Sequence, residues 1–257
     1  MLDIESLSNI TTQTEGEHAF HIMVLRPEEF EGLVSSVSGL LPEHYISPDS
    51  IADILERLGK TASAQKLKAK IPEATKTRSG DVGEVVTTDY IEGSTAYSVP
   101  IRKLRWRDHR DMAMRGDDVI GIHINPYDQS IRFLKAEAKA NKSLSRAVLR
   151  KAREELDNDG GLPAPHALGF VIDRLKDIGN HDLAHKIEKA QLVDGIRAEQ
   201  TEHLLFTFTA SDPSTLQKEA FESYKGNIKQ TSVGFRISAH QEFIESVYQG
   251  VIDGLDN

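Results

Sequence analysis

The segment that decides the fold covers residues 116–139 and has the sequence GDDVIGIHINPYDQSIRFLKAEAK. It contains two runs of β-branched and other apolar residues, 119–124 and 130–139. Between them lies the five-residue segment NPYDQ, whose composition is typical of a turn. We therefore expect an antiparallel β-hairpin in the middle of the chain.

The register of this hairpin determines which acidic side chains meet. With the turn centred in the middle of NPYDQ, paired positions sum to about 254, which places Asp118 opposite Ala136 and Asp117 opposite Glu137. Side chains alternate between the two faces of a strand, so Glu137 and Lys139 are expected on one face. An error of one residue in the register exchanges the two aspartates, so both remain candidates.

Carboxylates held a few ångströms apart repel each other and are tolerated mainly when a cation lies between them. Mg²⁺ prefers oxygen ligands and keeps several waters. We predict that Asp118 or Asp117, together with Glu137 and the backbone carbonyl of Ala138, holds one Mg²⁺, with Mn²⁺ as the alternative ion. The metal would activate a water molecule, and Lys139 would orient or deprotonate that water and stabilise developing negative charge.

A third acidic group, Glu84, comes from a separate predicted helix over residues 82–91. Residues 72–80 are polar and basic and are expected to form a loop, and Asp81 can cap the helix that follows. With its valines buried on one face, this helix would bring Glu84 to the edge of the sheet. There Glu84 could bind a second ion or a water molecule.

The charge of the chain is distributed unevenly. Its formal net charge is −9, yet residues 100–153 contain fourteen Lys or Arg against six Asp or Glu. A basic centre within an acidic chain indicates an anionic ligand, although ordinary solvated helix faces are the alternative. The residues predicted to bind nucleic acid are Arg102, Lys103, Arg105, Arg107, Lys142 and Arg146.

The rest of the chain alternates between strand and helix patterns, which predicts a mixed α/β fold. Strands are expected at 18–25, 203–209 and 232–238, with a further extended segment at 96–104. Helices are expected at 27–41, 51–58, 62–70, 143–156, 166–178, 181–192, 216–224 and 241–255. We expect residues 1–77 to form an accessory lobe with one strand and several helices, and residues 78–257 to form a core with C-terminal helices and strands.

The composition excludes several classes of site. The chain has no cysteine, so disulfides, thiolate metal sites and thiol nucleophiles are ruled out. No apolar run approaches the length of a membrane helix, and the first residues lack the pattern of a signal peptide. We expect a cytoplasmic protein without a membrane partner.

The order of these features resembles the core of the PD-(D/E)xK nucleases. The matching residues are a helix glutamate, Glu84, then GDDVIG at 116–121, then Glu137-Ala138-Lys139, followed by a basic helix. The resemblance implies a restriction-endonuclease-like mixed sheet flanked by helices, and Mg²⁺-dependent hydrolysis of DNA. One departure is that residues 143–156 lack the glutamine often found on this helix in recombination-type nucleases.

Within that superfamily, residues 78–156 look like HamA, the nuclease subunit family of the bacterial Hachiman anti-phage defence system. This resemblance implies a complex with a superfamily 2 helicase, HamB, which restrains the nuclease until DNA engages the helicase. Two alternatives stay open. The chain could be a non-catalytic regulatory or nucleic-acid-binding subunit with a nuclease-like fold, or an enzyme acting on RNA or a nucleotide.

Overall fold

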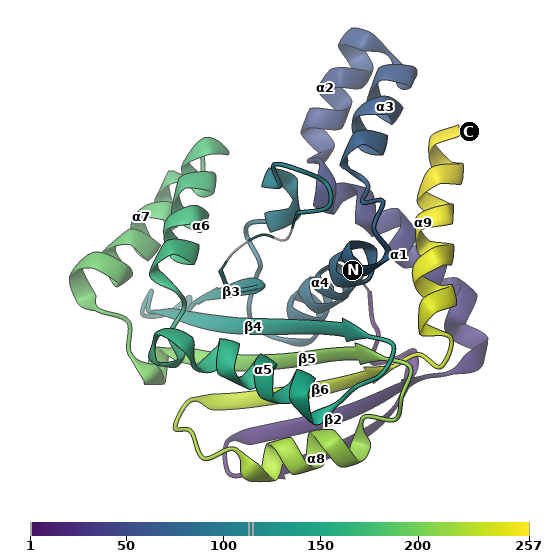
Figure 1. The fold of residues 1–257 in the computed structure, drawn as a ribbon. Helices are drawn as coiled ribbons and strands as arrows, with labels where there is room; N and C mark the ends of the chain where they lie inside the picture. Colours follow the sequence, from purple (N-terminus) through teal and green to yellow (C-terminus); the bar gives the residue numbers. More distant parts are fainter. Residues whose placement is uncertain (1, 113, 115, 257) are drawn as a thin grey trace.

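A six-stranded mixed sheet forms the centre of the molecule in the computed structural model, which describes residues 2–112, 114 and 116–256 (Figure 1). The strand order is β1-β2-β6-β5-β4-β3. Strands β2, β6, β5 and β4 run parallel to one another, while β1 and β3 are antiparallel to their neighbours. The bounds are Ser8–Glu15 (β1), His18–Leu25 (β2), Val119–Ile124 (β3), Ile131–Asn141 (β4), Thr201–Thr209 (β5) and Lys229–Arg236 (β6). The predicted mixed α/β class is confirmed.

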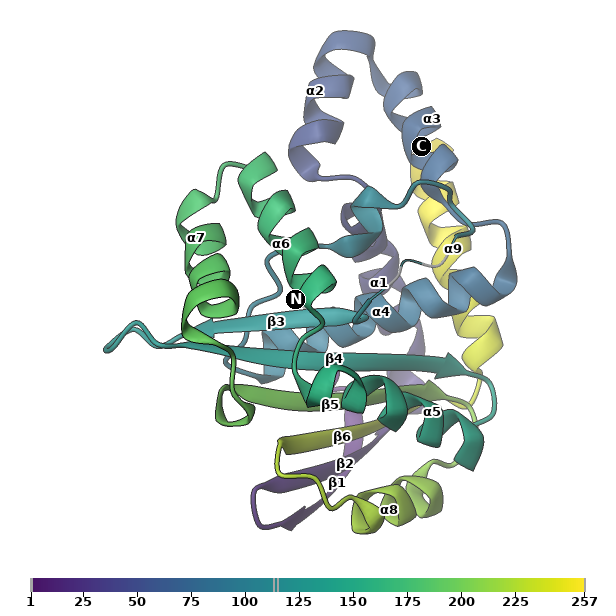
Figure 2. The same ribbon diagram turned by 60° about the vertical axis from the view of Figure 1, so that its left-hand side comes forward.

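Helices cover both faces of the sheet (Figures 1 and 2). Helices α1, α4 and α9 pack on one face, which we call the α4 face, and α5 and α8 pack on the other, the α5 face. In the part of the chain that is described, no helix is long and apolar enough to cross a membrane. The bounds are Phe30–Tyr45 (α1), Pro48–Leu58 (α2), Lys60–Lys70 (α3), Thr75–Ser94 (α4), Arg146–Asp157 (α5), Pro165–Asp177 (α6), His181–Lys189 (α7), Ser214–Ser223 (α8) and His240–Asp256 (α9).

The alternation of side chains along β5 explains the two layers of helices. Phe206 points to the α4 face, where its ring lies 5.5 Å from that of Tyr90 in α4. Its neighbour Leu205 points to the α5 face and packs with Leu149 and Ala152 of α5. Because consecutive residues are apolar, this strand is buried on both faces, as is typical of parallel strands covered by helices.

The N-terminal strand was predicted correctly, but a neighbouring strand was missed. Strand β2 covers the predicted residues 18–25 and pairs in parallel with β6. Strand β1 has the polar sequence SNITTQTE and lies at the edge of the sheet, where an apolar face is not required. The division of the chain at residue 77 stays a prediction, but β1 and β2 belong to the same sheet as the remaining strands.

Helix α4 begins earlier than expected. The predicted loop at 72–80 is wrong from Thr75 onward, since the helix runs through Gly80. Asp81 does not cap the helix but is buried inside it, where its carboxylate accepts hydrogen bonds from Arg107 and Tyr45. A buried ion pair and a buried apolar helix face outweigh the low helix propensity of one glycine.

The segment predicted to be extended at 96–104 forms no regular strand. Ser98 makes an isolated antiparallel bridge to Ile122 of β3. Residues Lys103–Trp106 then form a short 3-10 turn. From this bridge the chain runs towards the start of β3 and places Lys103 next to the acidic residues of the hairpin, where the Lys103 amine donates to the Asp117 carbonyl at 2.7 Å.

Candidate functional site

The unequal lengths of β3 and β4 create the site. Strand β3 pairs with β4 only from Ile124 opposite Ile131 to Val119 opposite Ala136. Strand β4 continues to Asn141, paired on its other side with β5. No strand among the described residues covers the β3 side of residues 137–141, which we call the open edge of β4. Its peptide groups are therefore available to side chains and ligands.

The predicted hairpin register is wrong by one residue. Paired positions sum to 255, because the loop contains six residues and its centre lies between Tyr127 and Asp128 rather than on Tyr127. Asp118 consequently reaches the open edge instead of facing Ala136. Its Oδ2 accepts a hydrogen bond from the Ala138 backbone N–H at 3.0 Å. The structure therefore distinguishes two aspartates that the sequence left equivalent.

The Asp117 side chain lies in the interior of the protein, whereas that of its neighbour Asp118 reaches the open edge. Its Oδ1 lies 3.5 Å from the Lys135 ammonium, and its Oδ2 accepts from the Ala164 N–H at 2.8 Å. Lys135 is almost fully buried and also donates to the carbonyls of Asn158 and Leu162. Asp117 is thus paired with a buried lysine, whereas Asp118 forms no ion pair within the described residues and interacts with Lys139 only at longer range.

The Ala138 carbonyl points to the same place as Asp118. In a strand, the N–H and C=O of one residue point to the same side, and the Ala138 N–H points to the open edge. Two residues further along the strand, the Ala140 carbonyl accepts a hydrogen bond from Ser79 of α4 at 3.3 Å. The Ala138 carbonyl therefore lies beside the Asp118 carboxylate at the edge, outside the pairing with β5.

Glu137 and Lys139 share the α5 face, as predicted from alternation along β4. Glu137 is paired with Leu205, whose side chain packs on α5, and its carboxylate accepts from the Lys139 ammonium. Burial raises the pKa of Glu137 to about 8, and repulsion from Asp118 adds to the shift while Lys139 opposes it. Burial lowers the pKa of Lys139, but the carboxylates of Glu137 and Asp118 outweigh that effect and raise it.

Glu84 approaches from the α4 face. The preceding residue is Gly83, where a Cβ would lie 2.8 Å from the Ala140 Cβ, so α4 can pack this closely on β4 only with a glycine there. Burial raises the pKa of Glu84 to about 8, and the carboxylates of Asp118 and Asp81 contribute while Lys103 opposes the shift. Asp118 thus lies between two acids, one from each face of the sheet.

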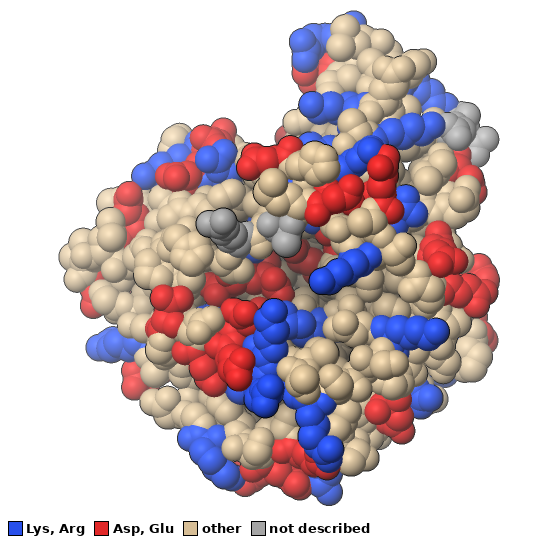
Figure 3. Space-filling view, viewed as in Figure 1, with Lys and Arg blue, Asp and Glu red and all other residues tan. Residues whose placement is uncertain are grey.

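A cleft of about 500 Å³ runs around the open edge. Figure 3 shows this face hollowed, with acidic atoms in its floor and basic atoms on its rim. Prediction from sequence did not single out two of its lysines, Lys76 and Lys151, although Lys151 lies on the predicted basic helix. The charged residues that line the cleft are Lys76, Asp81, Glu84, Lys103, Arg107, Asp111, Asp118, Lys139 and Lys151.

The basic residues predicted to bind nucleic acid are dispersed by the fold. Lys103 lies in the cleft, but Arg102 is paired with Glu92 and Arg105 donates to the Glu43 carbonyl. Arg107 is only 5% exposed at its side chain and makes two hydrogen bonds to the Asp81 carboxylate. The Arg107 guanidinium is occupied by this buried ion pair, so we do not assign it to phosphate binding.

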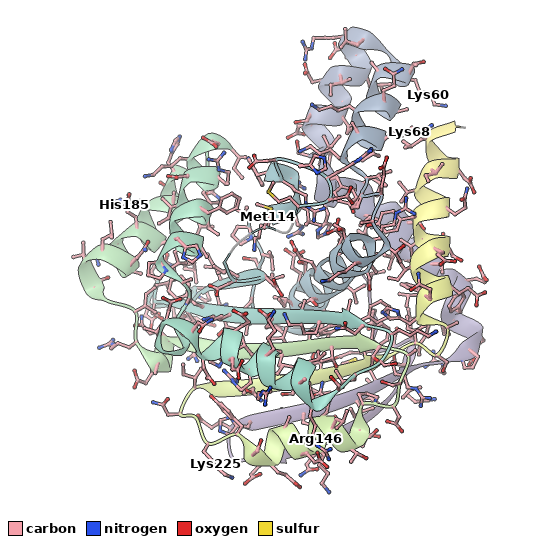
Figure 4. All side chains as sticks on the ribbon, viewed as in Figure 1. Lys60, Lys68, Met114, Arg146, His185 and Lys225 are labelled. Atoms are coloured by element: carbon pink, nitrogen blue, oxygen red, sulfur yellow. The ribbon has the colours of Figure 1, made fainter. Side chains whose placement is uncertain are left out.

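The other two predicted basic residues follow β4. Lys142 is exposed just beyond the end of the strand. Arg146 is exposed on α5, where its guanidinium binds both carboxylate oxygens of Glu219 in α8 at 2.9 Å (Figure 4). Trp106, in the same basic stretch as Arg105 and Arg107, is half-buried with its ring 6.1 Å from that of Phe170. None of these three residues lines the cleft.

The donor set at the open edge is suited to a hard cation, but its geometry is not that of a closed metal centre. Within the described ranges, no three acidic or histidine residues are arranged to hold a metal ion. The Lys139 ammonium contacts the Glu137 carboxylate, where a cation would be expected. The groups present are the carboxylates of Asp118 and Glu137 and the Ala138 carbonyl, all oxygen ligands of the type that Mg²⁺ binds together with waters.

Comparison with known proteins identifies the family of the chain. The model of the HamA family matches residues 2–251. The chain belongs to the HamA family. It is similar to the Hachiman protein HamA of Bacillus cereus, with 29% identity over 135 residues, covering 52% of this chain and 46% of the relative. The match therefore spans just under half the length of that curated relative.

Proposed function

We propose that this HamA-family chain is a metal-dependent DNA endonuclease that hydrolyses phosphodiester bonds as the effector of a bacterial anti-phage defence complex. The observation that carries the proposal is the meeting of Asp118, Glu137 and Lys139 at the open edge of β4, with Glu84 close by on the opposite face. These four residues occur in the order of the PD-(D/E)xK pattern. Hydrolysis of a phosphodiester needs acidic groups for a cation and a basic group beside it.

Asp118, Glu137 and the Ala138 carbonyl would hold Mg²⁺ or Mn²⁺. Burial raises the pKa of both Glu84 and Glu137, and repulsion from Asp118 adds to each shift; a cation bound among these carboxylates would offset that repulsion. When bound, the ion supplies activation of water and neutralisation of charge on the phosphate. For Glu137 to bind a metal, the Lys139 ammonium would have to release the carboxylate.

The lysines of the cleft give it affinity for a polyanion. Lys139 stands at the open edge, where its ammonium can contact a phosphate oxygen that gains negative charge during hydrolysis. Lys76, Lys103 and Lys151 line the same cleft and can pair with phosphates on either side of the scissile bond. Lys76 and Lys103 come from the α4 side of the cleft and Lys151 from α5, so a DNA backbone would pass between them.

The resemblance to HamA nuclease subunits suggests a partner. The curated relative is a Hachiman protein, and the family resemblance implies a superfamily 2 helicase, HamB, that holds the nuclease in check. The chain has a formal net charge of −9, which opposes general binding to DNA outside the cleft. Delivery of DNA by a helicase would suit a nuclease that has an acidic net charge and only a few lysines in its cleft.

The proposal is tested by incubating the purified chain with plasmid DNA and Mg²⁺, alone and together with HamB. We expect cleavage that is abolished by EDTA and by Glu137→Ala or Lys139→Ala, with both variants keeping the parent's circular dichroism spectrum. Glu219→Ala and Lys225→Ala are matched controls, because both residues are exposed and lie at α8 and just beyond it. Equal cleavage by Glu137→Ala and the parent would exclude the site, and cleavage of RNA alone would favour the other enzyme class.

One structural observation favours a second candidate, a non-catalytic regulatory or nucleic-acid-binding subunit with a nuclease-like fold. The contact between Lys139 and Glu137 satisfies both charges without a metal. Such a subunit would bind DNA through the cleft lysines without cutting it. It would show no Mg²⁺-dependent product with HamB present, and its DNA affinity would be unchanged by EDTA.

A further inference from the structure

A second cavity, of about 300 Å³, adjoins the cleft. The two share Glu84, Lys103, Met114 and Asp118, so they are continuous beside two of the acidic residues. We call the second cavity the side chamber. Its other walls are mainly apolar and are provided by Ile101, Val119, Ile120, Ala167, Phe170 and Val171.

An open apolar space of this size is unusual beside a well-packed core. Ile101, Val119, Ile120, Ala167 and Val171 are all buried and belong to hydrophobic clusters, yet α6 does not close the space between itself and β3. Protein interiors are close-packed, and cavities near 300 Å³ with apolar walls are the usual form of ligand sites. The side chamber therefore has the character of a binding site rather than a packing defect.

The aromatic wall of the chamber is held firmly. The Phe170 ring is packed edge-on against Trp106, with ring centroids 6.1 Å apart and planes at 88°. The guanidinium of Arg174 lies 5.6 Å from the centre of the same ring. Phe170 also lines the chamber, so the part of its ring that these two partners leave uncovered would contact a flat apolar ligand there, and stacking on an aromatic ring is similar for all four bases.

The position of the chamber beside Asp118 indicates which flat ligand it would bind. A phosphodiester bound at Asp118 would lie at the entrance, because Asp118 lines both spaces. The base attached to the neighbouring sugar is the nearest flat, largely apolar group. Enzymes that admit a base into a pocket take it out of the stack and hold it between aromatic and apolar side chains.

We propose that the side chamber binds one unstacked nucleobase next to the phosphate being cut, which makes single-stranded or locally unpaired DNA the preferred substrate. This inference rests on the proposed function, because it places DNA in the cleft. Apart from the charged residues where the chamber meets the cleft and Asp117, whose carboxylate is held by Lys135 and the Ala164 N–H, the polar side chains of the walls are Thr88 and His166, so the chamber accepts a base without reading its sequence. A paired base must first leave its helix, which disfavours intact duplex DNA.

A binding experiment tests the chamber without requiring cleavage. The affinity of the full chain for a fluorescent oligothymidylate is compared, in EDTA, with its affinity for an oligonucleotide of the same length built from abasic residues. We expect the oligothymidylate to bind about tenfold more tightly, the size of effect typical of one stacked base. Because both probes carry the same phosphates, the difference in affinity comes from the bases.

Ala167→Phe fills the chamber and should abolish the difference in affinity between the two probes. It should lower the affinity for the oligothymidylate and leave the affinity for the abasic probe unchanged. Ala220→Phe is the matched control, since Ala220 lines a cavity of about 410 Å³ between α5 and α8. Phe170→Leu removes the ring but keeps apolar bulk, and it replaces Ala167→Phe as the test if that variant does not fold. We expect Phe170→Leu to lower the ratio of the affinities for the oligothymidylate and the abasic probe about threefold.

The inference is overturned if the parent binds both probes equally or binds neither, or if Ala167→Phe folds and keeps the preference. Repeating the comparison with Mg²⁺ separates this inference from the proposed function. A preference for bases without any cleavage, also in the presence of HamB, would exclude the nuclease and keep the chamber. Cleavage with no preference between the probes would exclude base binding in the side chamber and keep the proposed nuclease.

Discussion

The two faces of the open edge of β4 carry similar acids in different surroundings. On the α5 face, Glu137 is buried but in contact with the Lys139 ammonium. On the α4 face, Glu84 has a pKa raised by burial to about 8, as Glu137 has, but among the described residues no lysine donates a hydrogen bond to it, although Lys103 lies near enough to oppose the shift. Asp118 stands between them and affects both. The difference suggests that the α5 face carries the reacting groups and that Glu84 supports them from the other side.

The largest expected effect compares the two glutamates directly. Glu137→Gln should lower the rate of Mg²⁺-dependent DNA cleavage about 10³-fold, since it removes a carboxylate that is proposed to hold the metal ion. Glu84→Gln should lower it only about 10- to 100-fold, as is typical of groups that support a metal site indirectly. Single-turnover cleavage rates measure both, with Glu219→Gln as the exposed control. A greater loss for Glu84→Gln would reverse the roles of the two faces.

The two neighbouring aspartates should separate activity from stability. Asp117→Asn leaves the buried Lys135 ammonium without its counter-charge and should lower the free energy of unfolding by about 3 kcal/mol. Asp118→Asn should lower cleavage strongly and change unfolding little, because no lysine depends on it in this way. Urea unfolding of both variants, beside cleavage assays, provides the test. If Asp118→Asn were the less stable variant, the assignment of Asp117 to a structural role in the interior and of Asp118 to the open edge would be wrong.

The approach of α4 to β4 depends on one glycine. Gly83→Ala should destabilise the protein by about 2 kcal/mol, because a Cβ there meets Ala140 and forces α4 away from the strand. The displaced helix should also reduce cleavage, since Glu84 is the next residue. Gly80→Ala, three residues earlier in the same helix, has no atom within 4 Å of its new Cβ and should stabilise the helix by about 1 kcal/mol. Equal effects of the two substitutions on thermal unfolding would contradict this close packing.

The smallest expected effect is a pH dependence on the α5 face. Burial lowers the pKa of His203 to about 4, and the nearby Arg153 and Lys135 lower it further against a hydrogen bond to Gly161. Below pH 6.5 the unfolded chain binds a proton at this histidine that the folded chain refuses, so stability falls as the pH falls. Between pH 6.5 and 5.5 this group should contribute a loss of about 1 kcal/mol.

His203→Gln should remove that contribution, since the amide keeps a donor and an acceptor but does not titrate in this range. The measurement is the free energy of unfolding in urea at several pH values, taken as the difference between parent and variant. Other buried histidines, among them His44 and His240, shift in the same direction and remain in both proteins. A difference that stays constant with pH would show that His203 takes up its proton equally in the folded and unfolded chains.

Local patterns in the sequence determined much of this protein. The hairpin, the shared face of Glu137 and Lys139, and most helices follow from the alternation or the 3.6-residue spacing of neighbouring side chains. Predictions failed where local signals are weak. The edge strand β1 needs no apolar face, and the first turns of α4 have a glycine and polar residues but are stabilised by tertiary contacts.

Only the tertiary structure decided which of the candidate residues converge. Asp118 rather than Asp117 reaches the open edge because the hairpin loop has one residue more than predicted and because the buried Lys135 holds Asp117. Arg107 was predicted to lie on the basic surface, but it forms a buried ion pair with Asp81, which lies 26 positions away in the chain. Such pairings depend on distances between elements that are remote in sequence, and no local periodicity records those distances.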